Sequence, residues 1–402
     1  MIAFGLALIA IAAAHVAYTF AGYPAILWLL ARVRRPNCTR RATRPGATVP
    51  VVTVTVPVYN EARQIAELLD NLLALDHPRD RLQILVISDA SDDDTDDIVR
   101  SYADRGVELL RMPVRRGKTA AENAARARVR GDIIVNTDAS IRLHPGAIRA
   151  LVVAFDDPTI GVASGRDVSV ARVGGGSNEG EARYVGYEMW VRSLETRVHG
   201  IVGASGCLFA MRRELHAHPT PEALARDFDS ALIAETHGMR AVSVPDAICH
   251  VPRTGSARRE YQRKVRTVTR GLATLLARRR LLDPFKHGIF AWMLLSHKLC
   301  RWLVPWALIL GVAGAVILAF AWLPPWAVVA AIAATAAGAW VAWRRLDNTS
   351  LPKPLSFAAY FLAANVATIH AWLRVARGRT EPIWEPTRRE PAGAGAAAPR
   401  SA

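Results

Sequence analysis

Cysteine is scarce in this chain, which has four cysteines among its 402 residues. Cys38, Cys207, Cys249 and Cys300 lie far apart, with no CxxC pair and no spacing typical of metal ligands. This pattern argues against a disulfide-stabilised scaffold and a zinc site, and it suits a reducing compartment.

Familiar loops for phosphate and calcium are missing as well. No GxxxxGK[ST] sequence occurs and no GxGxxG follows a predicted strand, so neither a P-loop nor a Rossmann dinucleotide site is supported. The acidic run DASDDDTDDIV, residues 89–99, has neither the turn glycine nor the closing glutamate of an EF-hand loop. Its aspartates precede a helical segment, where negative charge is favourable.

Acidic residues are outnumbered, because 35 Asp and Glu against 51 Lys and Arg give a net charge of +16. The arginines gather in residues 32–44, 253–280 and 374–389, beside apolar segments. This placement favours anionic lipid headgroups over nucleic acid. We therefore expect membrane lipids, and no nucleic acid, among the partners.

Long apolar runs, in contrast, are abundant, and 51% of the residues are hydrophobic. Residues 2–30 are nearly uncharged and long enough to cross a hydrocarbon core of about 30 Å. A cleaved signal peptide is disfavoured, because no basic region precedes the run and no small-residue cleavage site ends it. The arginines that follow place the next domain in the cytosol by the positive-inside rule.

Near the C-terminus, residues 303–323 and 326–343 are predicted to form a hairpin of two membrane spans, turned by Pro324 and Pro325. Residues 357–373 are a shorter third candidate, and the more polar residues 285–301 are predicted to lie in the membrane interface. Three C-terminal spans would put Arg374, Arg377 and Arg379 outside, so one of these segments is misassigned. We expect a multi-pass protein of the cell inner or plasma membrane, with the domain after the first span in the cytosol.

Short apolar strands alternate with helical stretches from residue 49 to residue 252, which predicts an α/β domain with a largely parallel sheet. The clearest strands are residues 51–56, 83–88, 132–137 and 242–244, and helical periodicity is best in residues 61–75 and 119–130. Gly174 to Gly176 predict a mobile loop. The predicted division is an N-terminal transmembrane helix (1–30), a basic linker (31–48), the cytosolic α/β domain (49–280), an interfacial helix (281–301), C-terminal transmembrane helices (302–376) and a cytosolic or disordered tail (377–402).

Acids stand at or just after the ends of three predicted strands: Glu61, Asp89 and Asp138. Each alone could be a helix N-cap. Together they favour a polar site, because ligands of open α/β sheets bind beyond the carboxyl ends of the strands. Such acids accept hydrogen bonds from a base or ribose, or hold a divalent cation. Lys118, in RRGKTAAEN, is either a phosphate partner or a solvated surface lysine.

These motifs, in this order and between apolar segments, resemble a membrane-bound inverting glycosyltransferase of family 2 with the GT-A fold, over residues 50–271. The resemblance extends to bacterial polysaccharide and poly-N-acetylglucosamine synthase-like enzymes. VPVYNE is similar to the first strand and nucleotide-binding turn, which implies donor contacts from Pro57, Tyr59 and Glu61.

The second motif, SDASDDDT, resembles S-D-G-S-x-D-G-T, with Ala90 and Asp94 replacing two glycines. It implies that Asp89 binds uracil and that Asp93 supports it. RGKTAAEN matches G-K-x-x-A-x-N, which implies that Lys118 lies near the donor diphosphate.

TDAS, residues 137–140, occupies the D-x-D position of the family. The resemblance implies that Asp138 contacts the donor ribose and a Mg²⁺ or Mn²⁺ ion that bridges the diphosphate. Ser140 replaces the second aspartate, which leaves the metal coordination open.

The acceptor and base segments follow. GASGCLFAMRREL is similar to the loop that lines the acceptor site, which implies roles for Gly203, Gly206 and Cys207. RDFDSALIAETHGMRAV resembles the segment with the catalytic base, which implies that Asp227 takes the acceptor proton, with Asp229 as the competitor. For Asp227 the alternative is a helix N-cap.

RKVRT stands where the family has Q-x-x-R-W, which implies diphosphate contacts from Arg263 and Arg266. The missing Gln and Trp weaken the case for a long-chain polymerase. The resemblance thus implies transfer of a sugar from a UDP-sugar to a membrane-associated or growing polysaccharide, with polysaccharide-export proteins as further partners. The alternatives are a single-transfer glycolipid synthase and a non-catalytic membrane transporter with a degenerate nucleotide domain.

Overall fold

The computed structural model describes residues 1–33, 49–170, 179–252, 257–321, 324–345 and 353–380. Most of the predicted basic linker (31–48), the predicted mobile loop at Gly174 to Gly176 and most of the predicted tail (377–402) lie outside the described residues.

A mixed eight-stranded sheet is the centre of the domain, with the strand order β3-β2-β1-β4-β7-β6-β8-β5. Strands β3, β2, β1 and β4 are parallel, β6 is parallel to β8, and β7 runs antiparallel between β4 and β6. The prediction of an α/β domain with a largely parallel sheet is confirmed. The strands are β1 (Val52–Val58), β2 (Leu82–Ser88), β3 (Val107–Arg111), β4 (Ile133–Thr137), β5 (Arg142–Leu143), β6 (Ile160–Val170), β7 (Leu208–Arg212) and β8 (Arg240–Pro252).

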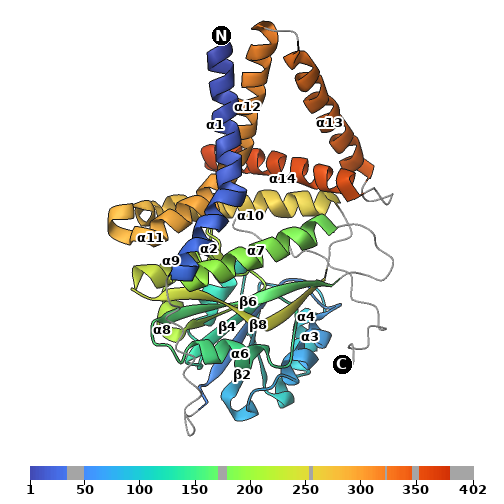
Figure 1. Ribbon diagram of the computed structural model, residues 1–402. Coiled ribbons are helices and arrows are strands. Elements are labelled where there is room, and N and C mark those ends of the chain that lie inside the picture. Colours follow the sequence, from blue (N-terminus) through green and yellow to red (C-terminus); the bar gives the residue numbers. More distant parts are fainter. Residues whose placement is uncertain (34–48, 171–178, 253–256, 322–323, 346–352, 381–402) are drawn as a thin grey trace, which may run out of the picture.

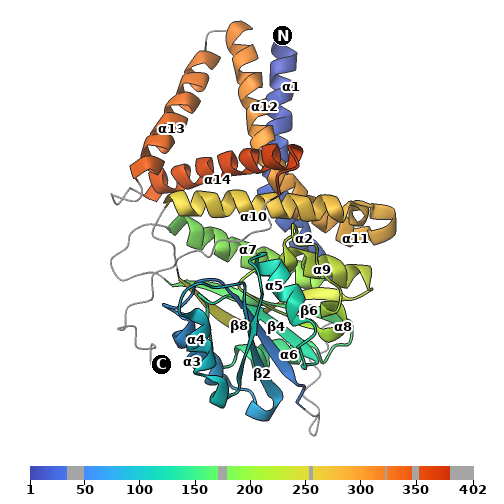
Figure 2. The ribbon, with the colours of Figure 1, turned by 180° about the vertical axis from the view of Figure 1, so that it is seen from behind.

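Helices cover both faces of this sheet (Figures 1 and 2). The helix predicted over 61–75 is shorter in the structure, α3 (Ile65–Leu73), and buries Ile65, Leu68, Leu69 and Leu72 against the strands. The helix predicted over 119–130 is α5 (Lys118–Ala125). The others are α4 (Thr95–Arg100), α6 (Ala147–Ala154), α7 (Glu179–Val198), α8 (Arg213–His216) and α9 (Arg226–Thr236).

Two helical runs are long and apolar enough to cross a membrane, Ile2–Val33 and Pro284–Ala321, and Pro325–Val341 is a shorter apolar helix. The first run comprises α1 (Ile2–Ala17), the π-helical turn η1 (Tyr18–Gly22) and α2 (Tyr23–Val33). The second comprises α11 (Pro284–Leu294), η5 (Leu295–Leu299) and α12 (Cys300–Ala321). The boundary predicted at residue 301 therefore falls inside a helical run.

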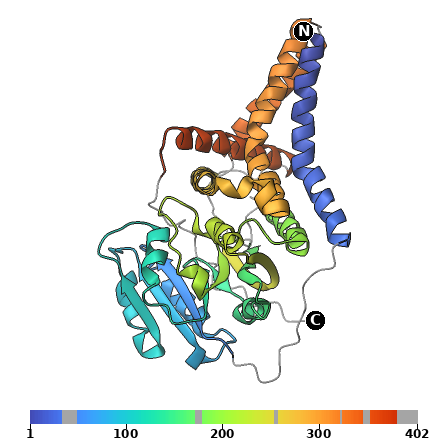
Figure 3. The ribbon, with the colours of Figure 1, turned by 90° about the vertical axis from the view of Figure 1, so that its left-hand side faces the viewer.

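Helices α1 and α12 stand side by side above the sheet domain and form a stalk (Figures 1 and 3). They approach closely through small residues, since a Cβ built on Gly314 would lie 2.7 Å from the carbonyl oxygen of Gly5. Close backbone approach at glycine is a common way for helices to pack in lipid.

A crosswise layer separates the stalk from the sheet domain. Helix α14 (Lys353–Ala376) lies across the direction of the stalk and packs on α10 (Ala257–Ala277), while α13 (Pro325–Arg345) slants away from α12 (Figures 1 and 2). The third candidate span, residues 357–373, belongs to α14. It therefore does not run alongside α1 and α12.

Two non-glycine residues in the turns after β1 and β2 have left-handed backbone angles, Asn60 with φ 54° and Ala90 with φ 57°. An L-residue other than Asn or Asp is disfavoured there by about 1–2 kcal/mol. Ala90 stands where the resembled motif has glycine, so the structure gives a conformational reason for that glycine.

We expect Ala90→Gly to raise the free energy of unfolding by about 1 kcal/mol, because glycine adopts this conformation without strain. The matched control is Ala150→Gly in the middle of α6, where a helical glycine is expected to lower stability by about 0.5–1 kcal/mol. Thermal unfolding in one detergent measures both. A decrease in Tm for both variants would contradict the strained conformation at Ala90.

Candidate active site

The three strand-end acids lie at one edge of the sheet, because β1, β2 and β4 are parallel and end at the same level. Asp89 is 2% exposed. Its two carboxylate oxygens accept hydrogen bonds from the backbone amides of Arg116, at 2.8 Å, and Gly117, at 2.7 Å. Asp89 therefore holds in place the loop that leads into Lys118.

The turns after β1 and β2, which hold the residues predicted to contact the sugar donor, are joined by hydrogen bonds. Glu61 donates its backbone amide to Thr95 Oγ1 at 2.8 Å, and Asp93 accepts from the amide of Ala62 at 3.2 Å. Pro57 is buried within β1, whereas the Tyr59 ring is covered by the Arg115 guanidinium, 3.7 Å from its centroid. This stacked pair is a flat surface of the kind on which a nucleobase stacks.

Lys118 is at the centre of the candidate site. Its ammonium lies 2.5 Å from Asp138 Oδ1 and 3.2 Å from the carbonyl oxygen of Gly206, and 4.0 Å from Glu122. Burial opposes the charged form of Lys118, but the nearby carboxylates, Asp138 first, more than offset it and raise its pKa above the usual value. Lys118 is thus a permanent cation at the edge where the strand-end acids lie.

Residues 203–207, which precede β7, form the opposite wall. A Cβ on Gly206 would lie 2.9 Å from Oδ2 of Asp227, and the amide of Ala204 donates to the backbone carbonyl of Asp227 at 3.2 Å. Cys207 accepts a hydrogen bond from Thr137 Oγ1, at the end of β4, through its carbonyl. The predicted acceptor residues therefore lie between Asp227 and the strand ends.

Asp227 and Asp229 differ sharply in their surroundings. Asp227 lies in the first turn of α9, where Ala225 is the N-cap residue, and its carboxylate accepts no hydrogen bond from the described residues. Asp229 is fully buried and its carboxylate oxygens accept from Arg278 at 2.8 and 3.1 Å, with a further bond from Thr220. Of the two, Asp227 has the carboxylate that is still available to a substrate.

Replacing Gly206 by alanine is expected to lower the transfer rate by about 10-fold or more, because the new methyl group takes the space of Asp227 Oδ2 and misplacement of a reacting group is costly. The control is Gly338→Ala in α13, whose Cβ would meet nothing within 4 Å. Initial rates at saturating donor separate this effect from donor affinity. A Gly206→Ala enzyme with an unchanged rate would show that the 203–207 loop does not position Asp227.

The predicted diphosphate arginines are on α10. Arg263 forms a two-point ion pair with Glu260 on the same helix, at 2.8 and 2.7 Å. Arg270 lies further along α10 and reaches the site, donating to Thr119 Oγ1 at 2.5 Å. Arg266 is one turn before Arg270, on the same helix face. The structure thus brings Arg270 to the site and shows Arg263 engaged elsewhere.

Three further residues near Lys118 were not predicted from the sequence as site residues: Glu122, Arg226 and Arg270. Both oxygens of Glu122 are buried without a hydrogen bond, its carboxylate lies 3.8 Å from Arg226, and burial raises its pKa. Arg226 donates to Asn123 at 3.0 Å, so the segment after Lys118 holds the start of α9. The G-K-x-x-A-x-N match, which contains Asn123, and the arginine next to Asp227 were the available signals.

Few side chains at the candidate site could act as metal ligands. Among the described residues no group of three or more His, Cys, Asp or Glu side chains could hold an ion. Asp138 and the buried Ser140 fit an ion that takes its remaining ligands from water and a diphosphate, as Mg²⁺ often does. The Lys118 ammonium neutralises Asp138 in the free protein.

We therefore expect Mn²⁺ to bind weakly on its own and at least about 10-fold more tightly with UDP present, because the diphosphate supplies ligands that the protein lacks. Calorimetric titration of Mn²⁺ with and without UDP measures this coupling. Asp138→Asn should weaken the coupling, and equal Mn²⁺ affinity in both titrations would contradict the assignment.

A family model described as Glycosyl transferase family 2 matches residues 53–218, which include all of the strand-end acids and the 203–207 loop. Residues 53–218 thus form a glycosyltransferase family 2 domain. The mannosyltransferase PcManGT from Pyrobaculum calidifontis, in complex with GDP-Man and Mn²⁺, superimposes with a TM-score of 0.66 at 27% identity, over 92% of this glycosyltransferase and 99% of that chain. The GT-A-like α/β fold implied by the motifs is confirmed.

Two curated relatives extend the comparison. An uncharacterized protein of Mycobacterium tuberculosis (strain CDC 1551 / Oshkosh) is 27% identical over 61% of this chain and 76% of its own length. An N-acetylglucosaminyltransferase of Rhizobium sp. (strain N33) is 29% identical over 58% of this chain, and the match spans 55% of that enzyme.

Proposed function

We propose that this family 2 glycosyltransferase transfers a sugar from a UDP-sugar to a membrane-associated acceptor, with inversion at the anomeric carbon, in the synthesis of a cell-surface glycan. The observation that carries the proposal is the position of Asp227. Its carboxylate, unlike that of Asp229, accepts no hydrogen bond from the described residues, feels the charges of Lys118 and Arg270, and borders the 203–207 loop beside the Lys118–Asp138 pair.

The residues present support a single displacement. Asp227 would accept the proton of the acceptor hydroxyl as it attacks the anomeric carbon. Lys118 would stabilise the charge that develops on the leaving diphosphate, with Arg270 nearby on α10. A divalent ion on Asp138 would add further charge stabilisation when bound. With one base and no covalent intermediate, the product has the inverted configuration.

A membrane location is supported by the two apolar helical runs. We propose that Ile2–Val33 and Pro284–Ala321 span the membrane and that α13 returns to the cytosolic side. Helix α14 then lies in the cytosolic interface, which keeps Arg374, Arg377 and Arg379 inside and satisfies the positive-inside rule. The crosswise position of α14 supports this topology over three C-terminal spans (Figure 1).

Nucleotide release by the purified protein in nanodiscs tests the function, across UDP-sugars and GDP-mannose, with Mn²⁺ or with EDTA. We expect release with one donor, dependent on Mn²⁺. GDP-mannose belongs in the panel because the similar mannosyltransferase binds it. Release with GDP-mannose alone would overturn the uridine part of the proposal, and absence of release with every donor, with membrane extract added as the acceptor source, would overturn the whole.

A further inference from the structure

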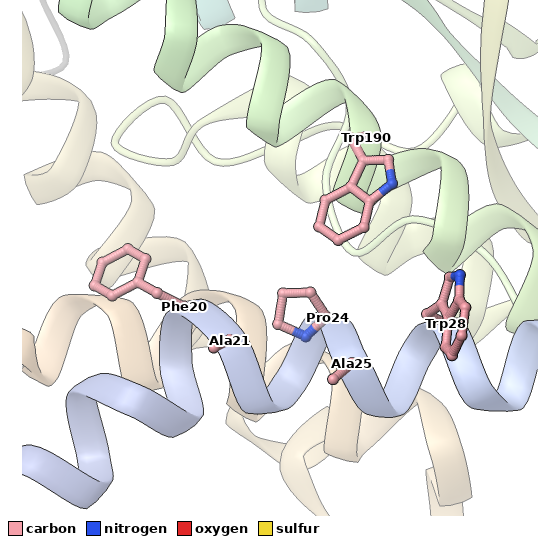
Figure 4. Close-up of a pocket in the computed structure, with 6 residues that line it drawn as sticks. All are labelled: Phe20, Ala21, Pro24, Ala25, Trp28 and Trp190. Carbon is pink, nitrogen blue, oxygen red and sulfur yellow. The ribbon is translucent and has the colours of Figure 1, made fainter.

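Two hollows outside the candidate active site meet at one side chain, Trp190 of α7. The first, of about 290 Å³, lies between α7 and the end of the first apolar run, and its walls are Phe20, Ala21, Pro24, Ala25, Trp28 and Trp190. Figure 4 shows Trp190 on one wall and the other five residues on the facing helix. Every residue that lines this hollow is apolar.

The second hollow, of about 450 Å³, lies on the other side of Trp190, between α7 and strands β6 and β8. Its lining includes the polar side chains of Arg166, Asp167, Ser193 and Ser243. Gly186 also lines it, and a Cβ there would meet nothing within 4 Å. This hollow therefore has both room and hydrogen-bonding groups.

The polar hollow is tied to the 203–207 loop. Ser205 donates to the Asp167 carboxylate, with Oγ at 2.6 and 2.8 Å from its two oxygens, and the amide of Cys207 donates to Ser205 Oγ at 3.1 Å. Asp167 thus anchors the loop that borders Asp227. A molecule in the polar hollow lies against the anchor of the candidate acceptor loop.

The apolar hollow is tied to the membrane helix. Tyr187 Oη donates to the carbonyl of Phe20 at 3.0 Å, which fixes α7 to the end of the first run. The Arg32 guanidinium lies 3.4 Å from the centroid of the Trp28 ring, an aromatic and basic pair typical of a membrane interface. Trp28 is 39% exposed and Trp190 45% exposed, so apolar surface is open at this level.

We propose that the two hollows form one groove for an amphipathic, lipid-linked acceptor, with the alkyl chain in the apolar hollow and the sugar headgroup in the polar hollow. The inference rests on the proposed function and names its acceptor class. Apolar walls at the level of the membrane and polar walls at the 203–207 loop match the two ends of such a molecule. Trp190 lines both hollows and sits where chain and headgroup join.

Photolabelling with a dodecyl β-maltoside that carries a diazirine at the chain end tests the groove, in nanodiscs of one phospholipid. We expect labelled peptides that contain residues 20–28 and 185–193. Ala25→Trp fills the apolar hollow and should lower this labelling by about tenfold, a loss of about 1.4 kcal/mol in binding. The matched control, Ala13→Trp, adds the same side chain on an exposed face of α1 and should leave labelling unchanged.

A second variant, Gly186→Leu, tests the groove without disturbing the fold, because a side chain at this position extends into open space. It fills part of the polar hollow and should therefore also lower the labelling. Labelling that spreads evenly over the apolar helices and ignores Ala25→Trp would overturn the groove, as would a Gly186→Leu protein labelled like the wild type. The donor panel separates the two proposals. One outcome would separate them: Ala25→Trp lowers the labelling, but the wild-type protein releases no nucleotide from any donor. The groove would then be a site for amphiphiles, and its role as an acceptor site would be overturned.

Discussion

Asp227→Asn is expected to lower the rate of sugar transfer by about 10²–10⁴, the usual contribution of a general base. Asparagine keeps the size and shape of the side chain but cannot accept the acceptor proton. Donor affinity should stay within about twofold, because the Asp227 carboxylate lies against Gly206 of the 203–207 loop, and the hydrogen bonds by which Asp89 holds the amides of Arg116 and Gly117 do not involve it. Single-turnover rates and calorimetric UDP affinity on the same preparation measure both quantities.

The matched control is Asp229→Asn, two residues away on α9. Asp229 is engaged by Arg278, so this variant should lose about 1–3 kcal/mol of stability while the folded enzyme keeps its transfer rate. If Asp229→Asn abolished transfer in folded protein and Asp227→Asn did not, the two aspartates would have to exchange their assigned roles.

Lys118→Gln is expected to have the second large effect, a fall in transfer rate of about 10²–10³. The substitution removes the cation that lies between Asp138 and Glu122, and it leaves the buried Glu122 carboxylate with Arg226 and Arg270 as nearby cations. The diphosphate would then meet uncompensated negative charge. Affinity for UDP should fall by about tenfold or more while affinity for uridine changes little, because the lost contact is with phosphate.

Lys286→Gln is the control, because it removes the same charge from an exposed side chain on α11. It should change neither affinity by more than the error of the titration. Equal losses of UDP and uridine affinity in Lys118→Gln would point to a general disturbance of the site and would contradict a diphosphate role.

Much of the fold could be predicted from the local pattern of apolar and turn residues. The strands at 83–88 and 132–137 agree with β2 and β4 to within a residue, because buried apolar runs bounded by turn residues are a strong local signal. The last predicted strand, 242–244, lies in the first half of β8. The structure continues this strand past Pro245 to Pro252, paired with β6, although a proline inside a run argues against a continuous strand in the sequence.

The ion pairs between charged side chains could not be predicted from the sequence. Asp227 and Asp229 lie two residues apart in the first turn of α9, and they are distinguished by Arg278, the residue that follows α10, and by Thr220, both of which bond Asp229. On α10 itself, several arginines share one face, and the sequence does not say that Arg263 is taken by Glu260 while Arg270 reaches Thr119. Such choices are made by tertiary contacts between residues far apart in the chain.

The orientation of one predicted span also depends on tertiary contacts. Residues 357–373 are apolar enough to suggest a span, yet α14 crosses the stalk and packs on α10. The conflict with the positive-inside rule was the available warning, because arginines follow this segment directly.

The anomeric configuration of the product tests the central claim most directly. The donor identified by nucleotide release is supplied with a ¹³C-labelled sugar, and the product in the membrane fraction is examined by NMR for wild type and Asp227→Asn. We predict a labelled product of inverted configuration that is absent from the variant. Retention of configuration, or the same product from Asp227→Asn, would contradict a single displacement with Asp227 as the base.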